Sequence, residues 1–485
     1  PRRRRRPPDH LRSARVLLVR ARSIGLGMFD LDELRAILPG RRWFGPATRT
    51  IDSFELFDYV TLTEGAHTLA LCLVKVAAEG GEPELFHLPL ARRPDGTFGD
   101  ITESPNALAP LAAACMAHRR IEGERGAFFF RGRAWPENAA SHARPLGLEQ
   151  SNTSVIFDDA VILKLFRRVA VGHNPDVEVS RWFAESNFEG APKYVADVSY
   201  DSDTLGHVDV AVAHHFAVGA RDAWNELVQK LSTWVETATA DSGGAGTPGL
   251  DAFVDSLALL TAELHDILGR NTDDPDFAPE PLHADRVNAL AVDVREHLRV
   301  TTTEYGIAAP SIEAWLQSLD ASDTPAWGDA IRVHGDYHLG QLLVTGEGLR
   351  VVDFEGEPSR SLAVRRSKHS PLKDVAGMMR SLSYAVGFAL RQTTDPTNTL
   401  RAERDALLSE WESRARLRFV NGYRERMRQA PIRIPSRETF DRLLALYEIE
   451  KVLYEVEYEA RFRPSWLDVP VGGIRRLEDR LAQGE

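Results

Sequence analysis

Two short stretches decide how this chain of 485 residues is expected to fold: VHGDYHLGQLL at residues 333–343 and LRVVDFEGEP at residues 349–358. The first places Asp336 between two histidines, with Gln341 five positions later. The second is an apolar run, typical of a buried strand, that ends on Asp353. A turn with a satisfied polar network would explain an isolated His-Gly-Asp, but not the amide and the second carboxylate that follow. The pattern therefore predicts a site for a metal-bound nucleotide.

The spacing within these stretches is that of a phosphoryl-transfer site. Such a reaction needs positioning, a metal that neutralises phosphate charge, and a carboxylate that accepts the proton of the attacking hydroxyl. Asp336 and Gln341 have the spacing of the kinase catalytic loop, and Asp353 stands where the Asp-Phe-Gly carboxylate binds metal. Mg²⁺ prefers hard oxygen ligands, so these two side chains and the phosphates of ATP suffice. We predict Asp336 as the catalytic base and Gln341 and Asp353 as Mg²⁺ ligands.

An upstream hairpin supplies the predicted contacts with ATP. Lys164 lies in the apolar strand AVILKLF, from which its ammonium group could reach the α- and β-phosphates. Glu178, in the next predicted helix, is its expected ion-pair partner; a solvent-facing lysine on an edge strand is the alternative. No Gly-x-Gly-x-x-Gly precedes Lys164, and the equivalent turn is EQSNTSVIF. Its hydroxyls, amide and backbone N–H groups are expected to meet phosphate. These residues are Ser151, Asn152, Thr153 and Ser154.

The order of predicted elements gives an α+β, bilobal architecture like that of protein kinases. Residues 50–90 alternate as in a meander, with turn signals at Glu64-Gly65 and Gly80-Gly81. Residues 120–165 are β-rich and end in a hairpin at Asp158-Asp159, before a helix with Asn174 as N-cap and Pro175 in its first turn. Amphipathic helices dominate after residue 219. We predict a β-rich N-terminal cap over 28–140, a small α/β lobe with the ATP-binding hairpin over 141–218, and a large, mostly helical lobe over 219–485.

Composition narrows the class of protein. The net charge of −12 disfavours a nucleic-acid partner, although the chain starts with PRRRRRPP. Since Met28 opens a more plausible domain start, residues 1–27 are interpreted as a disordered or non-native extension. Two cysteines form no disulfide framework, which fits a reducing compartment, and no apolar run reaches the roughly 18–20 residues that span a bilayer. We expect a cytoplasmic protein without a membrane partner.

Several motifs together resemble the actinobacterial maltokinases, which are aminoglycoside-phosphotransferase-like enzymes with a eukaryotic-kinase-like fold. They are LEQSNTSVIF, AVILKLFRRV, NPDVEV, the two stretches quoted first, SPLKDVAGMMRS, YEIEKVLYEVEYEARFRPSWLDVP and, in the cap, LPGRRWFG. The resemblance covers roughly residues 30–480, strongly from 147 onward.

This resemblance implies ATP and Mg²⁺ as cofactors, and maltose 1-phosphate as product on a route from trehalose-derived maltose to α-glucan. It implies that Asp374 stabilises the catalytic loop. It places adenine against the link formed by His214, His215 and Phe216. An isomerase that converts trehalose to maltose is a possible partner through the cap.

The predicted helix over residues 446–460 indicates where the sugar binds. At about 100° per residue, Leu446, Ile449, Leu453, Val456 and Ala460 form a core stripe. The opposite side combines tyrosines with charged residues, which suits a sugar ring and its hydroxyls, whereas a purely structural helix would show a solvated charged face. The tyrosines could instead pack under neighbouring helices. With Trp466 just beyond the helix and Asp336, the predicted sugar-binding residues are Tyr447, Glu448, Lys451, Tyr454, Glu455 and Tyr458.

Two other functions stay open, and one metal site is disfavoured. A relative that phosphorylates glucosamine, another sugar or an aminoglycoside is possible, because catalytic-core motifs do not determine the acceptor. A nucleotide-binding scaffold without catalysis is disfavoured, because the predicted catalytic, metal and phosphate residues are all present. His334 and His338 are spaced like zinc ligands, but a glycine-containing loop is the wrong setting. We expect a structural, backbone-bonding role for His334.

Overall fold

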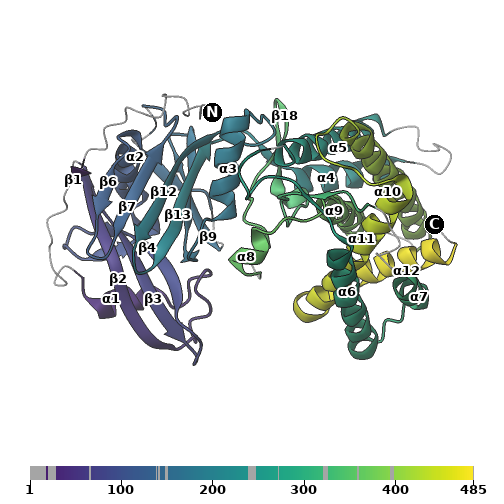
Figure 1. Ribbon diagram of the computed structural model, residues 1–485, viewed down its shortest axis with the longest axis horizontal. Coiled ribbons are helices and arrows are strands. Elements are labelled where there is room, and N and C mark those ends of the chain that lie inside the picture. The colour runs from purple at the N-terminus through teal and green to yellow at the C-terminus, as the bar shows by residue number, and fades with distance from the viewer. Residues whose placement is uncertain are drawn as a thin grey trace, which may run out of the picture. The chain divides into compact units, whose positions relative to one another are not determined.

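The computed structural model describes residues 18–19, 29–64, 67–137, 139, 142–147, 151–238, 247–270, 272–319, 326–357, 360–393 and 398–483. It consists of two compact units, shown in Figure 1. Unit 1 contains Pro1–Asn187 and Pro192–Val218, and unit 2 contains Phe188–Ala191 and Gly219–Glu485. The division after Val218 coincides with the predicted start of the helical lobe. The prediction for residues 1–27 lies outside the described residues, except for positions 18 and 19.

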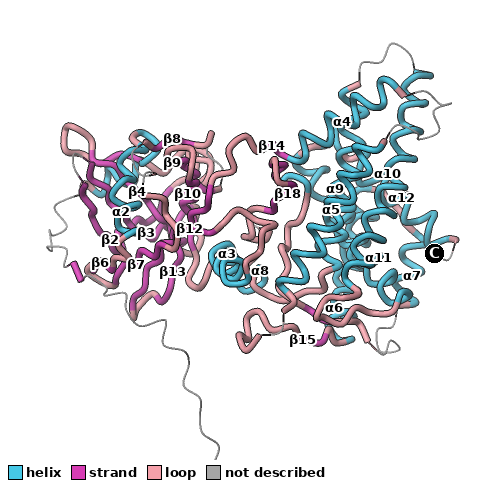
Figure 2. The backbone as a smooth tube through the Cα atoms, turned by 90° about the horizontal axis from the view of Figure 1, so that it is seen from above, coloured by secondary structure: helices cyan, strands magenta, loops and turns pink. Residues whose placement is uncertain are grey.

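Strands dominate unit 1, and helices dominate unit 2, as Figure 2 shows. The predicted α+β class with a kinase-like fold is therefore confirmed. The helices of unit 1 are α1 (Leu31–Ala36), α2 (Ala109–Met116) and α3 (Pro175–Ser186). Its strands are β1 (Leu18–Val19), β2 (Ile51–Glu64), β3 (His67–Ala78), β4 (Glu84–Arg92), β5 (Phe98–Asp100), β6 (Arg120–Glu122), β7 (Ala127–Gly132), β8 (Ala143–Pro145), β9 (Asn152–Phe157), β10 (Val161–Phe166), β11 (Arg168–Val169), β12 (Tyr194–Ser202) and β13 (Gly206–His215).

Unit 1 contains two sheets. The predicted meander is the antiparallel run β2–β3–β4, extended by β5 and β11. The second sheet has eight strands in the order β1-β6-β7-β12-β13-β10-β9-β8. One hydrophobic cluster combines Phe57 and Leu71 of the meander with Leu163 and Val198 of the larger sheet. The predicted boundary at residues 140/141 falls between β7 and β8, which belong to the same sheet, so cap and small lobe share a core.

Local sequence determines the elements that carry the predicted ATP contacts. Asp158 and Asp159 have φ values of 47° and 53° and close the β9–β10 hairpin, in the left-handed region that Asp tolerates better than most residues. α3 begins after Asn174, whose side chain accepts the N–H of Asp176, with Pro175 at the first helical position. Both predictions are confirmed.

Unit 2 is built around long helices. They are α4 (Ala223–Thr237), α5 (Pro248–Leu268), α6 (Ala284–Tyr305), α7 (Pro310–Ser318), α8 (Leu362–Arg365), α9 (Leu372–Gln392), α10 (Asn398–Met427), α11 (Arg437–Phe462) and α12 (Asp468–Ala482). Its short strands are β14 (Arg221–Asp222), β15 (Glu280–Pro281), β16 (Asp329–Ala330), β17 (Leu342–Thr345) and β18 (Gly348–Val351). The helices expected after residue 219 begin with α4 and α5.

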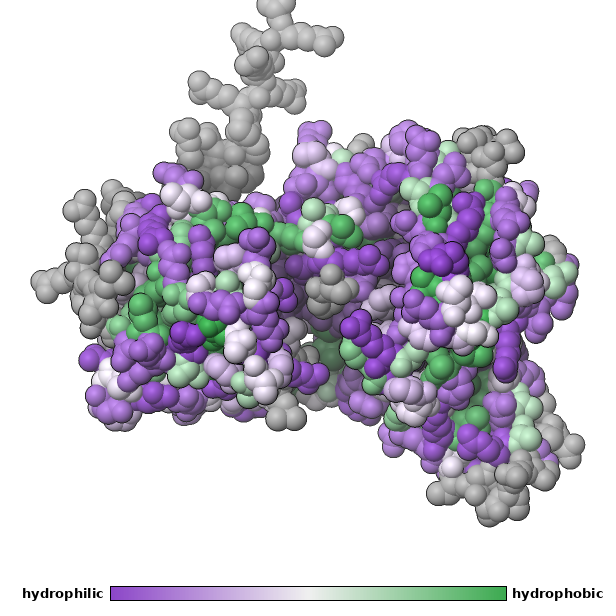
Figure 3. All heavy atoms as spheres, turned by 90° about the horizontal axis from the view of Figure 1, so that it is seen from below, coloured by the Kyte–Doolittle hydropathy of each residue, from purple (hydrophilic) through white to green (hydrophobic). Residues whose placement is uncertain are grey.

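Helix α11 is the centre of unit 2, since it packs against α6, α9 and α12. Its predicted core stripe is largely correct, because Leu446, Ile449, Leu453 and Val456 are all fully buried. Polar and charged residues cover much of the face seen in Figure 3, with smaller apolar patches between them. None of the described helices has the length and apolar character needed to cross a membrane.

Candidate active site

A loop between β16 and β17 carries Asp336, and a buried carboxylate fixes its backbone. Asp374, in the first turn of α9, accepts the N–H of His334 at 2.7 Å and that of Gly335 at 2.9 Å. His265 lies 3.2 Å from the same carboxylate. Burial acts to raise the pKa of Asp374, but His265, His334 and the Gly335 N–H outweigh it and lower the pKa. This geometry agrees with the expected role of Asp374 as the support of the loop.

The conformation of the loop explains the glycine and the first histidine of the motif. Gly335 has a φ of +82°, in the left-handed region that favours glycine. His334 is buried; its Nε2 donates to the Val352 carbonyl at 3.0 Å, and its Nδ1 accepts the Asp336 N–H at 3.4 Å. The imidazole therefore ties the loop to the strand that precedes Asp353, as a structural role for His334 requires.

The carboxylate of Asp336 lies beside two basic groups. Its oxygens are 3.8 Å from His338 Nε2 and 3.9 Å from Lys451 Nζ. His338 Nδ1 accepts the Gly340 N–H, so Nε2 carries the proton that faces the carboxylate. Burial would raise the pKa of Asp336, but the nearby N–H of His338 and the charge of Lys451 outweigh it and hold the pKa well below its ordinary value. Asp336 is therefore ionised at neutral pH, as an acceptor of a hydroxyl proton must be.

The β17–β18 hairpin brings the two predicted metal ligands together. Leu342 is paired with Val351, so Gln341, one residue before this pair, lies close to Asp353, two residues after it. Gln341 Nε2 is 3.2 Å from Asp353 Oδ2. Two cis ligands on one Mg²⁺ at 2.0–2.1 Å are about 2.9 Å apart, so the spacing fits once the amide turns its oxygen to the ion. Asp353 has a φ of 68°, unusual for a residue other than glycine and typical of functional sites. The donor set therefore fits Mg²⁺.

A row of side chains on α11 runs outward from Asp336. Lys451 Nζ lies 5.1 Å from the centre of the Tyr454 ring, and the rings of Tyr454 and Tyr458 stack 6.3 Å apart. Burial, a hydrogen bond to Glu357 and the nearby Asp336 raise the pKa of Tyr454. Three of the predicted sugar-binding residues thus lie in one row that begins at the predicted base.

Three other predicted sugar contacts do not agree with the structure. Tyr447 is 5% exposed and buried in the interior of unit 2. Glu448, 2% exposed, pairs with Arg416 and Arg480. Glu455, 7% exposed, pairs with Arg380 at 2.8 Å. The physical reason is that other helices cover α11 on several sides, so the side chains at these three positions are buried against them.

Trp466 lies at the far end of the row. It is half-buried, its ring stacks on Phe388 at 5.2 Å, and Arg391 covers it at 4.4 Å. Arg463 lies over both Tyr458 and Trp466, at 5.2 Å and 5.7 Å from the ring centres. Trp466 is therefore continuous with the tyrosine row but packed on α9, which leaves only part of its surface for a sugar.

Within unit 1, Lys164 has an acidic partner on α3. Its Nζ forms an ion pair with Asp176 Oδ2 at 3.0 Å, and both side chains are largely buried. Glu178 lies in the same first turn of the helix. The sequence-based reasoning named Glu178 and missed Asp176, although both follow the N-cap within one turn. The role of Glu178 stays a prediction.

The β9 strand separates the four predicted phosphate contacts. Ser154 is the cross-strand partner of Lys164, so the two side chains share one face of the hairpin, and Asn152 lies on that face two residues earlier. Ser151 precedes the strand and is exposed. Thr153 points the other way: it is 3% exposed, and its hydroxyl accepts a hydrogen bond from Arg167 at 2.8 Å. The prediction that Thr153 contacts phosphate through its side chain therefore does not agree with the structure.

The link predicted to hold adenine is partly occupied by internal hydrogen bonds. The His215 N–H donates to the Lys193 carbonyl and the Phe216 N–H to the Ala160 carbonyl, both at 2.8 Å. The His214 side chain is hydrogen-bonded to Ser180 at 2.8 Å, and burial lowers its pKa. Adenine recognition by this link would therefore have to use groups other than these two backbone donors.

Unit 2 thus has an ionised aspartate beside a lysine and a tyrosine row, and an amide and a carboxylate suited to Mg²⁺ on the β17–β18 hairpin. Transfer of a phosphoryl group to a hydroxyl requires groups of these kinds. Fold and site together define the class of protein: it is a kinase-type phosphotransferase.

Comparisons with known proteins agree with this class. Residues 142–356 match the profile of the phosphotransferase enzyme family, and residues 38–106 match the maltokinase N-terminal cap domain. A glucosamine kinase from Mycolicibacterium smegmatis is 26% identical over 352 residues, which are 71% of this chain and 82% of that protein. A glucosamine kinase from Streptacidiphilus jiangxiensis is 29% identical over 339 residues, 67% of this chain and 71% of that protein.

A solved structure shares the fold. The structure of a glucosamine kinase in complex with glucosamine, ADP and inorganic phosphate has a TM-score of 0.67 and 21% identity, and covers 91% of this chain and 98% of that one. Residues 142–356 are thus similar to the phosphotransferase enzyme family, and residues 38–106 are similar to a maltokinase N-terminal cap.

Proposed function

We propose that this enzyme is an ATP- and Mg²⁺-dependent sugar kinase that phosphorylates the anomeric hydroxyl of maltose to give maltose 1-phosphate. In this reaction the bond between the γ-phosphorus and the β–γ bridging oxygen breaks, a bond from that phosphorus to O1 of the sugar forms, and the proton of O1 passes to Asp336. The observation that carries the proposal is the ionised Asp336 at the start of the row Lys451–Tyr454–Tyr458.

Other side chains take positioning roles in this proposal. Gln341 and Asp353 would hold Mg²⁺, which neutralises phosphate charge when bound. Lys164, Ser154 and Asn152 share one face of the β9–β10 hairpin and would contact the phosphates of ATP. Asp176 orients Lys164.

Charge near the acceptor favours a neutral sugar. An amino sugar carries an ammonium group, which calls for carboxylates that are not already neutralised. Glu448 and Glu455 are buried in pairs with arginines, and Lys451 places a positive charge 3.9 Å from Asp336. Tyrosine faces suit the C–H side of a sugar ring, and their hydroxyls suit its OH groups. This arrangement supports maltose.

Glucosamine is the second candidate. The two curated relatives described above are glucosamine kinases, and the solved structure holds glucosamine. Glu357, hydrogen-bonded to Tyr454, is a carboxylate on the sugar side that could receive an ammonium group. The maltose proposal has three further parts: a role in α-glucan synthesis, a cytoplasmic location, and a trehalose-to-maltose isomerase as partner of the cap. The match of residues 38–106 to a maltokinase cap supports them.

An acceptor panel tests this assignment. ADP release is measured with maltose, glucosamine, glucose and kanamycin, and the products are identified by ³¹P NMR, which distinguishes an anomeric phosphate from a phosphate on another hydroxyl. We expect the highest kcat/KM for maltose and an anomeric product. Phosphorylation of glucosamine without turnover of maltose would establish the second candidate instead.

The variant Lys451→Met separates the role of charge from that of shape. If the lysine charge disfavours the ammonium group, this variant gains activity on glucosamine relative to maltose, whereas Arg463→Met, farther along the row, leaves the ratio closer to that of the wild type. An unchanged ratio in Lys451→Met would contradict the electrostatic argument.

A further inference from the structure

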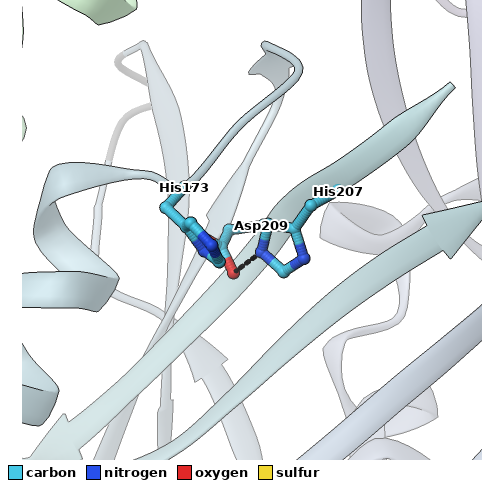
Figure 4. A group of neighbouring side chains, drawn as sticks. All are labelled: His173, His207 and Asp209. Atoms are coloured by element: carbon cyan, nitrogen blue, oxygen red, sulfur yellow. Dashed lines mark hydrogen bonds and ion pairs between the residues drawn. The ribbon is translucent and has the colours of Figure 1, made fainter.

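Unit 1 contains a group of metal-ligand side chains for which the proposed kinase reaction has no use. His173, His207 and Asp209 each offer one ligand atom, and these atoms all lie within 4.8 Å of one another. Figure 4 shows the two imidazoles on either side of the Asp209 carboxylate. His207 Nε2 is 3.1 Å from Asp209 Oδ1, and His173 Nδ1 is 4.0 Å from Asp209 Oδ2.

The backbone holds these three residues together. His207 and Asp209 are two positions apart on β13, so their side chains point to the same face of the sheet. The segment before α3 runs beside β13: Gly172 forms a bridge with Val208, and its N–H donates to the His207 carbonyl at 2.7 Å. This pairing places His173 next to His207, with their ring centres 4.1 Å apart.

Neighbouring groups orient the ligands as in known metal sites. His207 Nδ1 is hydrogen-bonded to Asp201 at 2.8 Å and Nε2 to Asp209 at 3.1 Å, so a metal ion that replaces the Nε2 proton would meet the lone pair of this nitrogen beside Asp209. A carboxylate on the outer nitrogen of a histidine is the common support of a metal-bound imidazole. The second oxygen of Asp209 accepts the Asn174 N–H at 2.8 Å, which fixes the carboxylate.

The distances suit a small divalent ion. Two ligands on one metal at about 2.0–2.1 Å are roughly 3.4 Å apart in a tetrahedral site and about 2.9 Å apart in an octahedral one. The 3.1 Å between His207 and Asp209 falls in this range, and His173, whose ligand atom lies within 4.8 Å of the other two, needs a side-chain shift of at most about 2 Å to join them. Two imidazoles and one carboxylate favour Zn²⁺, Ni²⁺ or Cu²⁺, whereas Mg²⁺ prefers oxygen ligands.

An ion pair without metal explains only part of the cluster. Burial acts to lower the pKa of His207, but its hydrogen bonds to Asp209 and Asp201 outweigh burial and raise the pKa, so His207 could pair with these carboxylates as a cation. That explanation does not require a second imidazole, that of His173, with its ring centre 4.1 Å from that of His207.

We propose that His173, His207 and Asp209 bind one transition-metal ion of the Zn²⁺ class, separate from the Mg²⁺ proposed at Gln341 and Asp353. The ion would join β13 to the residues immediately before α3. Since Asp176 lies in the first turn of α3, the metal would fix the start of the helix that orients Lys164.

Co²⁺ is the probe that tests this site, because its visible absorption reports nitrogen and oxygen coordination. The full-length chain, without a histidine tag, is titrated in excess Mg²⁺, which occupies the oxygen site. We expect one Co²⁺ per chain, displaced by Zn²⁺, and an affinity at least tenfold lower in His173→Gln and in His207→Gln. The control His67→Gln removes an exposed histidine of β3 and should bind like the wild type.

Thermal unfolding supplies an independent measurement. Zn²⁺ should raise the melting temperature of the wild type and of His67→Gln, but not that of His173→Gln. The His173 side chain is 45% exposed, so its replacement is expected to leave the fold intact. The proposal is refuted if the wild type shows no Co²⁺ absorption, or if His173→Gln and His207→Gln, still folded, bind Co²⁺ as tightly as the wild type.

Discussion

Replacing Asp336 by asparagine isolates the proposed proton acceptor, because the amide keeps the shape of the side chain and removes its charge. The loop backbone should not change, since it is held by Asp374 and not by the Asp336 side chain. A positioned general base contributes typically 100- to 10,000-fold to turnover, so kcat should fall by about that factor. Because Asp336 is not among the proposed nucleotide contacts, the affinity for ATP should stay near that of the wild type.

The structure limits how much stability this variant can lose. Lys451 Nζ lies 3.9 Å from the carboxylate, and Coulomb's law at this distance gives about 1 kcal/mol in water and about 4 kcal/mol at an effective dielectric constant near 20; the His338 N–H, at 3.8 Å, contributes no more than the lysine. The side chains are 24–41% exposed, so about 1 kcal/mol per pair is appropriate. A loss of at most about 2 kcal/mol lowers the melting temperature by roughly 2–4 °C. Unfolding cannot therefore account for a 100-fold loss of turnover.

The assay measures ADP release at saturating sugar and ATP, together with nucleotide affinity by calorimetry and the melting temperature. Asp255→Asn is the matched control, because Asp255 pairs with Arg418 on the surface and the same chemical change there should leave turnover unaffected. If Asp336→Asn keeps more than a tenth of wild-type turnover, Asp336 is not the general base.

Four further predictions follow from individual contacts. Glu448→Gln should destabilise the fold by about 3–5 kcal/mol, because it breaks a buried ion pair with Arg416 and Arg480. The sugar KM of the folded variant should be unchanged. A raised sugar KM without loss of stability would instead indicate that Glu448 contacts the sugar. Tyr458→Leu should raise the sugar KM by roughly fivefold, since an aromatic contact contributes about 1 kcal/mol, and an effect on the KM for ATP alone would place the sugar elsewhere. Asp353→Asn should weaken binding of Mg·ATP but not of metal-free ATP, in paired calorimetric titrations; equal losses would argue against metal ligation. Burial and, second, Arg167 lower the pKa of His87 from 6.5 to about 3, so on acidification the unfolded chain is protonated at His87 before the folded chain is. The free energy of unfolding should therefore fall as the pH drops from 6.5 toward 3, by about 2 kcal/mol between pH 7 and pH 5. Chemical unfolding of the variant His87→Gln should lack this part of the acid sensitivity.

Several features follow from the sequence because they depend on residues close together in the chain. The Asp158-Asp159 turn, the Asn174 cap with Pro175, and the short distance between Gln341 and Asp353 are set by spacing and by a two-strand register. The prediction of a phosphoryl-transfer loop likewise rests on spacing alone.

Only the tertiary structure decided which polar residues face a substrate. Glu448 and Glu455 lie on α11 beside the tyrosines, and their burial depends on ion pairs with arginines at positions 380, 416 and 480, which lie on other helices. Asp176 and the paired imidazoles of His173 and His207 emerge in the same way, since their neighbours lie on strands distant in sequence. The periodicity of a sequence indicates the direction in which a side chain points. The groups that contact this side chain depend on tertiary packing, which no local sequence pattern encodes.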